Sequence, residues 1–239
     1  MTGNNQSNLS PQILEELRAL ALPQKRDVLM KFFKTGKGEY GEGDRFLGIT
    51  VPLVRQTARR YFVASMATIT PLLQSPWHEA RLCGLMLLLN RYNKCPDERS
   101  ELVEFYLSQA PRINNWDLVD LSAPGIVGHY LLTHPRQLLY RLAADPLLWN
   151  RRIAVVSTLT LIRHDEWTDT LRLVELLKGD TESLMHKAMG WMLREVGKRN
   201  ETVLTDYLEQ NATTLPRTTL RYAIERFAPE KRRYFLQLT

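Results

Sequence analysis

The stretch DPLLWNRRIAVV, residues 145–156, contains in one place the pattern that decides the fold. Asp145 followed by Pro146 is a typical helix start, and the apolar residues after it recur at helical spacing. Arg152 lies near the beginning of this helix, and the small residue Ala154 follows two places later. The stretch therefore predicts a helix with one distinctive face.

Four other helical segments repeat this arrangement. Each opens with a basic or polar residue, and a small residue often follows two or three places later. The opening residues, 34–36 positions apart, are Arg81, Asp117, Arg152, Lys187 and Arg221. A repeat of this length is typical of a helical solenoid, in which helix pairs stack because neither helix can bury its apolar face alone.

Helix start signals also occur every ten to twenty residues along the rest of the chain. They are Ser10-Pro11, Thr50, Thr70-Pro71 and Ser75-Pro76. Sustained alternation of apolar and polar residues, which would predict strands, is absent from the sequence. We therefore expect an all-α protein with one domain over residues 1–239. Its expected parts are N-terminal helices at 10–62, a repeat core at 67–227 and a C-terminal capping helix at 229–239.

Composition limits the class of protein. With 239 residues, 44% of them hydrophobic and 24% charged, the chain can bury a sizeable core. Its 32 Lys and Arg against 26 Asp and Glu give a net charge of +6 and a pI near 9.4. This charge suits a polyanionic partner but does not identify one.

Metal sites and membrane segments are not indicated. Cys83 and Cys95 are the only cysteines, and the five histidines show no zinc-binding spacing. The first residues are polar, and the longest apolar run, Leu85–Leu89, is too short to span a bilayer. We expect no metal, no cofactor, no membrane association and a cytoplasmic location.

The register of the repeat also indicates which side chains share a surface. With the opening residue of each repeat as position zero, Trp116 lies at minus one, Asp120 at plus three, Arg152 at zero and Trp191 at plus four. At about 100° per residue these positions cover an arc of roughly 140° on one helix face. If consecutive repeats stack in parallel, two indoles, a carboxylate and a guanidinium share one groove.

Four motifs in this register resemble the AlkD family of DNA glycosylases. In chain order they are FLGI (46–49), NNWDLVD (114–120), WNRRIA (149–154) and KAMGWMLRE (187–195). The resemblance extends from about Phe46 to Lys198. It implies a HEAT-like solenoid, an α-α superhelix, whose concave face binds duplex DNA. It also implies a monofunctional glycosylase of base excision repair that releases cationic purines of the 3-methyladenine and 7-methylguanine type without a base-flipping pocket.

The resemblance implies roles for particular residues. By match to the motifs, Asp120 is the catalytic aspartate, Trp116 and Trp191 are its aromatic partners, and Arg152 binds a backbone phosphate near the lesion. Further phosphate contacts are expected from Lys187, Arg194, Arg151 and Lys198. The expected partner is double-stranded DNA containing alkylated bases, bound by a monomer.

The chemistry needs only one carboxylate. A purine alkylated at N3 or N7 already carries positive charge, so it leaves without a general acid. Only the developing sugar cation needs stabilisation, which Asp120 would supply electrostatically while it orients the attacking water. The two indoles would hold the deoxyribose and the cationic base by packing and cation–π attraction, each contributing about 0.5 to 2 kcal/mol.

Each of these residues also has an ordinary structural explanation. Asp117 and Asp120 are typical of helix caps, Trp116 and Trp191 of a core, and lysines and arginines of a solvated face. The joint arrangement favours the glycosylase. The alternative is a non-catalytic repeat scaffold that binds DNA or protein, in which substitutions at Asp120 or Trp116 would be expected.

Three glycines within residues 35–44 form a GxGxxG string. The string follows a helical segment rather than a strand, and Glu39 and Glu42 would repel a phosphate. We expect a mobile loop and no nucleotide site there. His186 is expected to be structural or to face solvent.

Overall fold

The structure, a computed structural model that describes residues 7–238, is built from fourteen α-helices joined by short 3-10 and π turns. No strand occurs in this part of the chain, so the all-α prediction is confirmed. The helices form two compact units, the first ending at Leu118 and the second beginning at Val119. The boundary falls inside α7 (Trp116–Ala123), so the expected domain over 1–239 contains two centres of packing.

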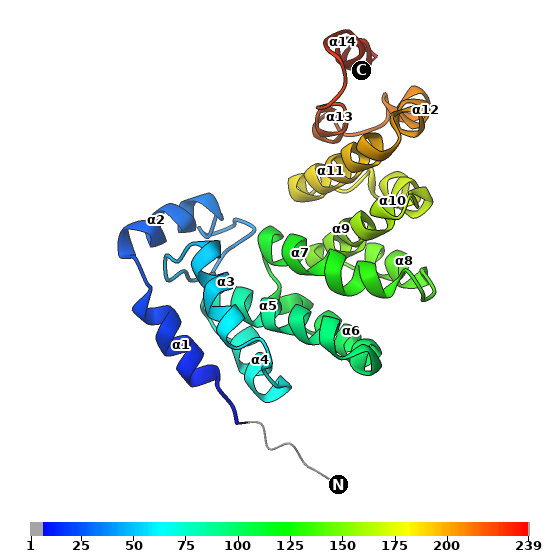
Figure 1. Cartoon of the computed structure of the whole chain (residues 1–239). Helices are drawn as coiled ribbons and strands as arrows, with labels where there is room; N and C mark the ends of the chain where they lie inside the picture. Colours follow the sequence, from blue (N-terminus) through cyan, green and yellow to red (C-terminus); the bar gives the residue numbers. More distant parts are fainter. Residues whose placement is uncertain (1–6, 239) are drawn as a thin grey trace. The chain divides into compact units, whose positions relative to one another are not determined.

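The first unit is organised around one buried helix. Helix α5 packs against α1, α3, α4 and α6 and is buried around most of its circumference (Figure 1). The helices of this unit before α7 are α1 (Ser10–Ala19), α2 (Pro23–Phe32), α3 (Val51–Arg60), α4 (Met66–Leu73), α5 (His78–Lys94) and α6 (Arg99–Ser108), with 3-10 turns at Pro96–Glu98 and Ala110–Arg112. The buried residues of α5 include the polar side chains His78, Glu79 and Arg81, which need hydrogen-bond partners within the unit.

Helix α2 is the exception in the first unit because none of its residues is buried. Its apolar side chains Val28 and Phe32 are 65% and 61% exposed. The helix is therefore held to the unit by its ends and by a few half-buried side chains.

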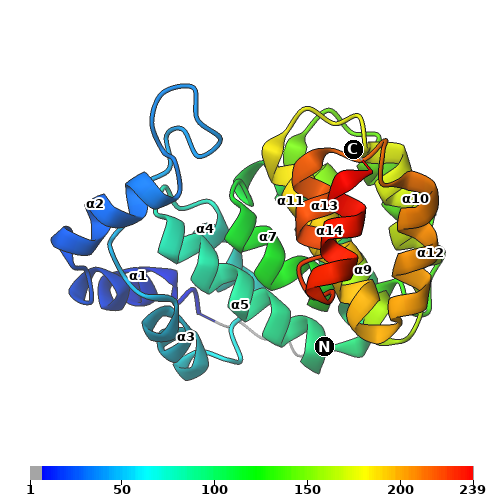
Figure 2. The ribbon, with the colours of Figure 1, turned by 90° about the horizontal axis from the view of Figure 1, so that it is seen from above.

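The second unit repeats helix pairs. Helices α9, α11 and α13 pack side by side, and α8, α10 and α12 pack against them (Figure 1). Figure 2 shows α10 and α12 together on one side of α11 and α13. The elements after α7 are η3 (Pro124–Gly128), α8 (Gln137–Ala143), α9 (Leu148–Arg163), α10 (Thr168–Leu177), α11 (Ser183–Arg199), α12 (Glu201–Asn211), α13 (Arg217–Ala223) and α14 (Pro229–Gln237). The helical repeat predicted from the sequence is confirmed.

The opening residues of the repeat all lie near helix starts, in α5, α7, α9, α11 and α13. Among the small residues that follow the opening residues, Gly190 is required by the packing of two helices. A Cβ atom at Gly190 would lie 2.5 Å from Cβ of Tyr222 and 2.6 Å from the carbonyl oxygen of Thr219. Only glycine lets α11 and α13 approach this closely.

Most helix starts agree with the sequence signals. Helix α1 begins at Ser10, and Thr50 directly precedes α3. One signal was wrong, because Pro71 lies inside α4, which begins earlier, after Ser65. The ring removes one helical hydrogen bond without ending the helix. The C-terminal helix α14 matches the expected capping helix, of which Thr239 lies outside the described residues.

Candidate functional site

An ion pair with two parallel hydrogen bonds joins Asp120 on α7 to Arg152 on α9. Arg152 Nε donates to Oδ1 at 2.9 Å, and Nη2 donates to Oδ2 at 2.8 Å. Arg152 Nη1 donates to the carbonyl oxygen of Leu184 at 2.6 Å. Arg152 is only 4% exposed, whereas the side chain of Asp120 is 17% exposed. The guanidinium is thus a buried support, and the carboxylate has an edge that solvent can reach.

This geometry does not fit the phosphate contact expected of Arg152. All three guanidinium nitrogens already bind acceptors within the protein, and the group is shielded from solvent. Bidentate pairing with a guanidinium fixes both the charge and the orientation of a carboxylate. In the structure, Arg152 therefore fixes the orientation of the Asp120 carboxylate.

Trp191 is the second residue of the candidate site in the second unit. Its half-buried indole donates from Nε1 to Oε1 of Glu195, one helical turn later on α11, at 3.1 Å. Lys198 Nζ donates to the same oxygen at 2.6 Å. Glu195 therefore tethers the indole edge. The sequence prediction did not include Glu195, although its spacing of four residues from Trp191 is the spacing of facing side chains on a helix.

Besides Arg152, three of the expected phosphate contacts have acidic partners, and one of them is Lys198, which pairs with Glu195. Arg151 Nε donates to Oδ2 of Asp180 at 2.7 Å, and its Nη1 donates to two backbone carbonyl oxygens. Arg194 pairs with Glu225. These pairs neutralise cations that the sequence left available for DNA.

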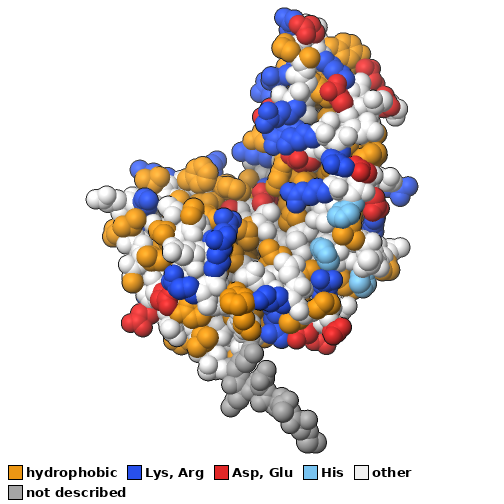
Figure 3. Space-filling view, viewed as in Figure 1, with side chains coloured by type: hydrophobic (Ala, Val, Ile, Leu, Met, Phe, Trp, Pro, Cys, Tyr) orange, Lys and Arg blue, Asp and Glu red, His pale blue; other side chains and the backbone are white. Residues whose placement is uncertain are grey.

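Lys187 differs from them. It is exposed near the start of α11, and among the described residues its ammonium group has no partner. Figure 3 shows basic side chains gathered along the side of the second unit where α11 and α13 lie. Lys187 is thus the expected phosphate contact whose charge the structure leaves unpaired. His186, its neighbour, is half-buried and bonds through Nε2 to the carbonyl oxygen of Asp180 at 2.5 Å.

Trp116 belongs to the first unit and packs on an aromatic cluster. It stacks on Phe33, with ring centroids 5.3 Å apart, and meets the exposed ring of Phe32 edge-on at 5.9 Å. The indole is half-buried. It is therefore supported from one side while part of its surface is accessible.

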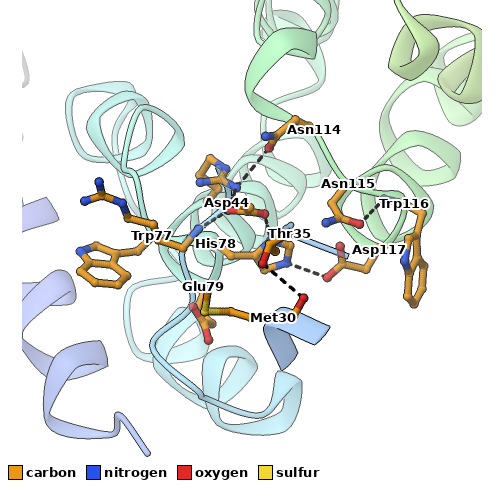
Figure 4. Close-up of polar contacts among 12 residues, drawn as sticks. Met30, Thr35, Asp44, Trp77, His78, Glu79, Asn114, Asn115, Trp116 and Asp117 are labelled. Carbon is orange, nitrogen blue, oxygen red and sulfur yellow. Dashed lines mark hydrogen bonds and ion pairs between the residues drawn. The ribbon is translucent and has the colours of Figure 1, made fainter. Parts of the chain in front are cut away.

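A buried network of four charged side chains holds the first turn of α7 (Figure 4). His78 contacts Asp44 Oδ2 through Nδ1 at 2.7 Å and Asp117 Oδ2 through Nε2 at 2.8 Å. Arg81 Nη2 donates to the other oxygen of Asp44 at 2.6 Å and to Asn114 Oδ1 at 3.1 Å. The network therefore connects the loop after α2, the start of α5 and the residues that lead into α7.

The pKa values in this network favour charged groups. Burial opposes protonation of His78, but the charges and hydrogen bonds of Asp117 and Asp44 outweigh it and raise the pKa of His78 to about 9. Burial also opposes ionisation of Asp44, yet His78 and Arg81 lower the pKa of its carboxyl. At neutral pH the network thus contains two cations and two anions, and both ring nitrogens of His78 donate.

The FLGI motif has a structural explanation in the same unit. The buried carboxylate of Glu79 accepts hydrogen bonds from the backbone amides of Leu47, Gly48 and Ile49 at 2.8, 2.8 and 3.1 Å. Gly48 has φ of +90°, a conformation that favours glycine. The motif is therefore a backbone loop built around one carboxylate.

The glycine-rich segment at 35–44 is less free than the sequence indicated. Its own glutamates cap two of its amides, because Glu39 accepts from Gly36 N and Glu42 accepts from Gly38 N, both at 2.9 Å. At the end of the segment Asp44 is buried in the charged network. The expected mobile loop is thus anchored at its end, and two of its amides are occupied by carboxylates.

Residues 7–238 contain no group of three or more His, Cys, Asp or Glu side chains that could hold a metal ion. In the same residues no helix is long and apolar enough to cross a membrane.

Comparisons with known proteins identify relatives of the fold and the family of the chain. The fold is similar to that of a solved structure described as a predicted DNA alkylation repair enzyme from Enterococcus faecalis, with a TM-score of 0.68 and 19% sequence identity. The similarity covers 87% of this chain and 97% of that one. No curated protein matches the chain. The model of one family, described as DNA alkylation repair enzyme, matches residues 13–227, so the chain belongs to the family of DNA alkylation repair enzymes.

Proposed function

We propose that this protein is a monofunctional DNA glycosylase that hydrolyses the N-glycosidic bond of cationic alkylated purines, such as 3-methyladenine and 7-methylguanine, in duplex DNA. It would begin base excision repair as a cytoplasmic monomer without cofactor or metal. Family membership supports a role in alkylation repair. The observation that carries the glycosylase is the partly exposed carboxylate of Asp120, held by buried Arg152.

The reaction suits a single carboxylate. The bond between C1′ and the purine nitrogen breaks, and its electron pair neutralises the cationic base, which leaves as a neutral purine. Positive charge develops on the sugar, and the oxygen of a water molecule bonds to C1′ and loses a proton to solvent or to the carboxylate. A carboxylate beside C1′ stabilises the cationic transition state and orients the water.

Asp120 is well prepared for this role. As the partner of Arg152 in a salt bridge it carries negative charge, and the two parallel hydrogen bonds fix the plane of the carboxylate. A preorganised charge needs no rearrangement when the transition state forms. Each carboxylate oxygen can accept more than one hydrogen bond, and the side chain is 17% exposed, so a water molecule can approach the carboxylate.

The aromatic and basic residues would hold the damaged nucleotide and its strand. Trp116 and Trp191 each have a supported, partly accessible indole for a cationic base or a deoxyribose. Lys187 would contact a phosphate directly. Arg194 and Lys198 would exchange their glutamate partners for phosphate, which costs little because exposed ion pairs contribute only about 0–1 kcal/mol.

Release of free base from a duplex containing N7-methylguanine tests the proposal. We expect release by the wild type and a loss of about a hundredfold or more in Asp120→Asn, because preorganised electrostatic groups contribute factors of this size. Asp206→Asn, an exposed aspartate on α12, is the matched control and should keep full activity. Duplex affinity should be unchanged in both variants. The melting temperature should be unchanged in Asp206→Asn but lower in Asp120→Asn, because that variant leaves buried Arg152 without its counter-charge, so release is compared at a temperature where both variants are folded.

Two results would contradict the glycosylase. One is the absence of base release by the wild type from duplexes carrying 3-methyladenine or 7-methylguanine. The other is an Asp120→Asn variant that releases base as fast as the wild type. Tight duplex binding without release would favour the alternative, a non-catalytic repeat scaffold.

A further inference from the structure

A pocket of about 360 Å³ lies in the first unit, away from Asp120 and Trp116 in the sequence. It is lined by side chains of α2 and of the segments that precede α3 and α5. They are Arg26, Asp27, Met30, Arg45, Phe46 and Trp77. We call it the Arg45–Trp77 pocket. Pockets that bind small molecules usually have volumes of about 300 to 1,000 Å³, so it can hold one small planar ligand.

The wall of the pocket is fixed by the backbone. Arg45 and Trp77 form an isolated backbone bridge, and the carbonyl oxygen of Arg45 accepts from His78 N at 2.7 Å. Phe46 is 1% exposed and stacks on the His78 ring, with centroids 4.3 Å apart. In Figure 4 Trp77 and Trp116 lie on opposite sides of His78. The wall of the pocket is therefore connected to the charged network through His78, and its shape is formed without a ligand.

The groups at the mouth of the pocket are unsatisfied. Arg45 is exposed, and within the described residues its guanidinium has no acceptor. The half-buried indole of Trp77 stacks on no other ring in that part of the chain. Arg26 shares its charge with Asp27 at 3.1 Å, and both side chains are about half exposed or more. The pocket lining thus contains two arginines and one aspartate, and the indole of Trp77 beside them has a face that no other ring covers.

We propose that the Arg45–Trp77 pocket binds one unpaired nucleotide, with the base against Trp77 and the phosphate on Arg45. An aromatic platform beside a cation is the combination that proteins use for single-stranded nucleic acid, because every base has a face that stacks. Half-buried Met30 supplies apolar surface for the ring, and Arg45 supplies a planar donor for phosphate oxygens. A site of this kind would hold a strand end or a frayed base during repair.

Binding of two duplexes that differ only in a short thymidine overhang tests the pocket. The overhang should tighten binding by the wild type about fivefold or more, since stacking of one base contributes about 1 to 3 kcal/mol. Trp77→Leu keeps an apolar wall but removes the stacking face, and Arg45→Gln removes the cation; both should lose the gain. Arg55→Gln, an exposed arginine on α3 outside the pocket, should keep it.

A second arm identifies the source of the nucleotide. The chain has five tryptophans, so the signal of Trp77 is obtained as the fluorescence difference between wild type and Trp77→Phe. Quenching of this signal by free thymidine monophosphate, without a gain from the overhang, would identify a free nucleotide as the ligand. A gain from the overhang identifies a DNA strand.

The proposal is overturned if neither ligand is bound, or if Trp77→Leu and Arg45→Gln bind both ligands like the wild type while their melting temperatures are unchanged. The pocket shares no residue with the Asp120 pair, and binding rather than base release is measured. Failure of the proposed glycosylase would therefore leave this result unaffected.

Discussion

Arg152 holds Asp120 through two parallel hydrogen bonds of 2.9 and 2.8 Å, and a third bond from Arg152 to the carbonyl oxygen of Leu184 fixes the guanidinium itself. The pair connects α7 to α9, and Leu184 lies on α11. Three successive repeats thus meet at the guanidinium of Arg152. The orientation of Asp120 therefore depends on how these helices stack.

Arg152→Lys tests whether this arginine positions the carboxylate. Lysine keeps the charge but cannot donate two parallel hydrogen bonds, so Asp120 would lose its fixed orientation. We expect base release to fall by an order of magnitude or more. The slope of log affinity for undamaged duplex against log salt should stay at the wild-type value, because no phosphate contact is lost.

The two readouts separate positioning from phosphate binding. If Arg152 contacted a phosphate, Arg152→Lys would keep most of its activity. Arg152→Gln would then reduce the salt slope by about 0.9 for the lost contact. Those results together would show that the buried pair is not the functional state.

The repeat could be predicted from the sequence because close stacking of helices favours a small residue at a similar place in most repeats. Gly190 shows this directly, since any side chain there would collide with α13. The candidate carboxylate and the two indoles could be named because they fall in motifs of a known family.

The group that the guanidinium of Arg152 binds could not be predicted in the same way. The place of Arg152 on a helix face is the same whether the guanidinium meets a phosphate or a carboxylate. The charged network was missed for a related reason, because His78 is 34 residues from Asp44 and 39 residues from Asp117. No local pattern joins such residues, and only the packing of the helices brings them together.

Lys187→Gln should weaken binding to DNA of any sequence. The exposed ammonium group has no partner in the described part of the chain, so it can release a counterion from a phosphate. We expect the salt slope of duplex binding to fall by about 0.9. Arg163→Gln, at the far end of α9, is the control and should not change it. An unchanged slope in Lys187→Gln would remove this residue from the DNA interface.

Gly190→Ala should destabilise the second unit by about 1 to 3 kcal/mol, the usual cost of overpacking. The new methyl group would lie 2.5 Å from Cβ of Tyr222 and 2.6 Å from the carbonyl oxygen of Thr219. Relieving these contacts requires the backbone of α13 to move. Gly179→Ala is a matched control, because a Cβ there meets nothing within 4 Å. Denaturant unfolding of both variants measures the difference, and equal stabilities would contradict the close approach of α11 and α13.

The stability of the first unit should fall at alkaline pH because of His78. Its pKa is about 9 in the folded chain and 6.5 in the absence of the network, so folding favours the protonated ring. The resulting stabilisation is complete below about pH 6.5 and is lost as the pH rises through 9. At about 1.4 kcal/mol per pKa unit, the loss is on the order of a few kcal/mol.

Titration of the His78 ring by NMR, together with denaturant unfolding from acid to alkaline pH, measures both effects. Asp117→Asn removes the carboxylate that raises the pKa of His78 more than Asp44 does, so the titration and the loss of stability should both move to lower pH. His164→Gln, an exposed histidine on the second unit, should leave both curves unchanged. A His78 resonance that titrates near 6.5 in the wild type would show that the ring is not held as a cation between Asp44 and Asp117.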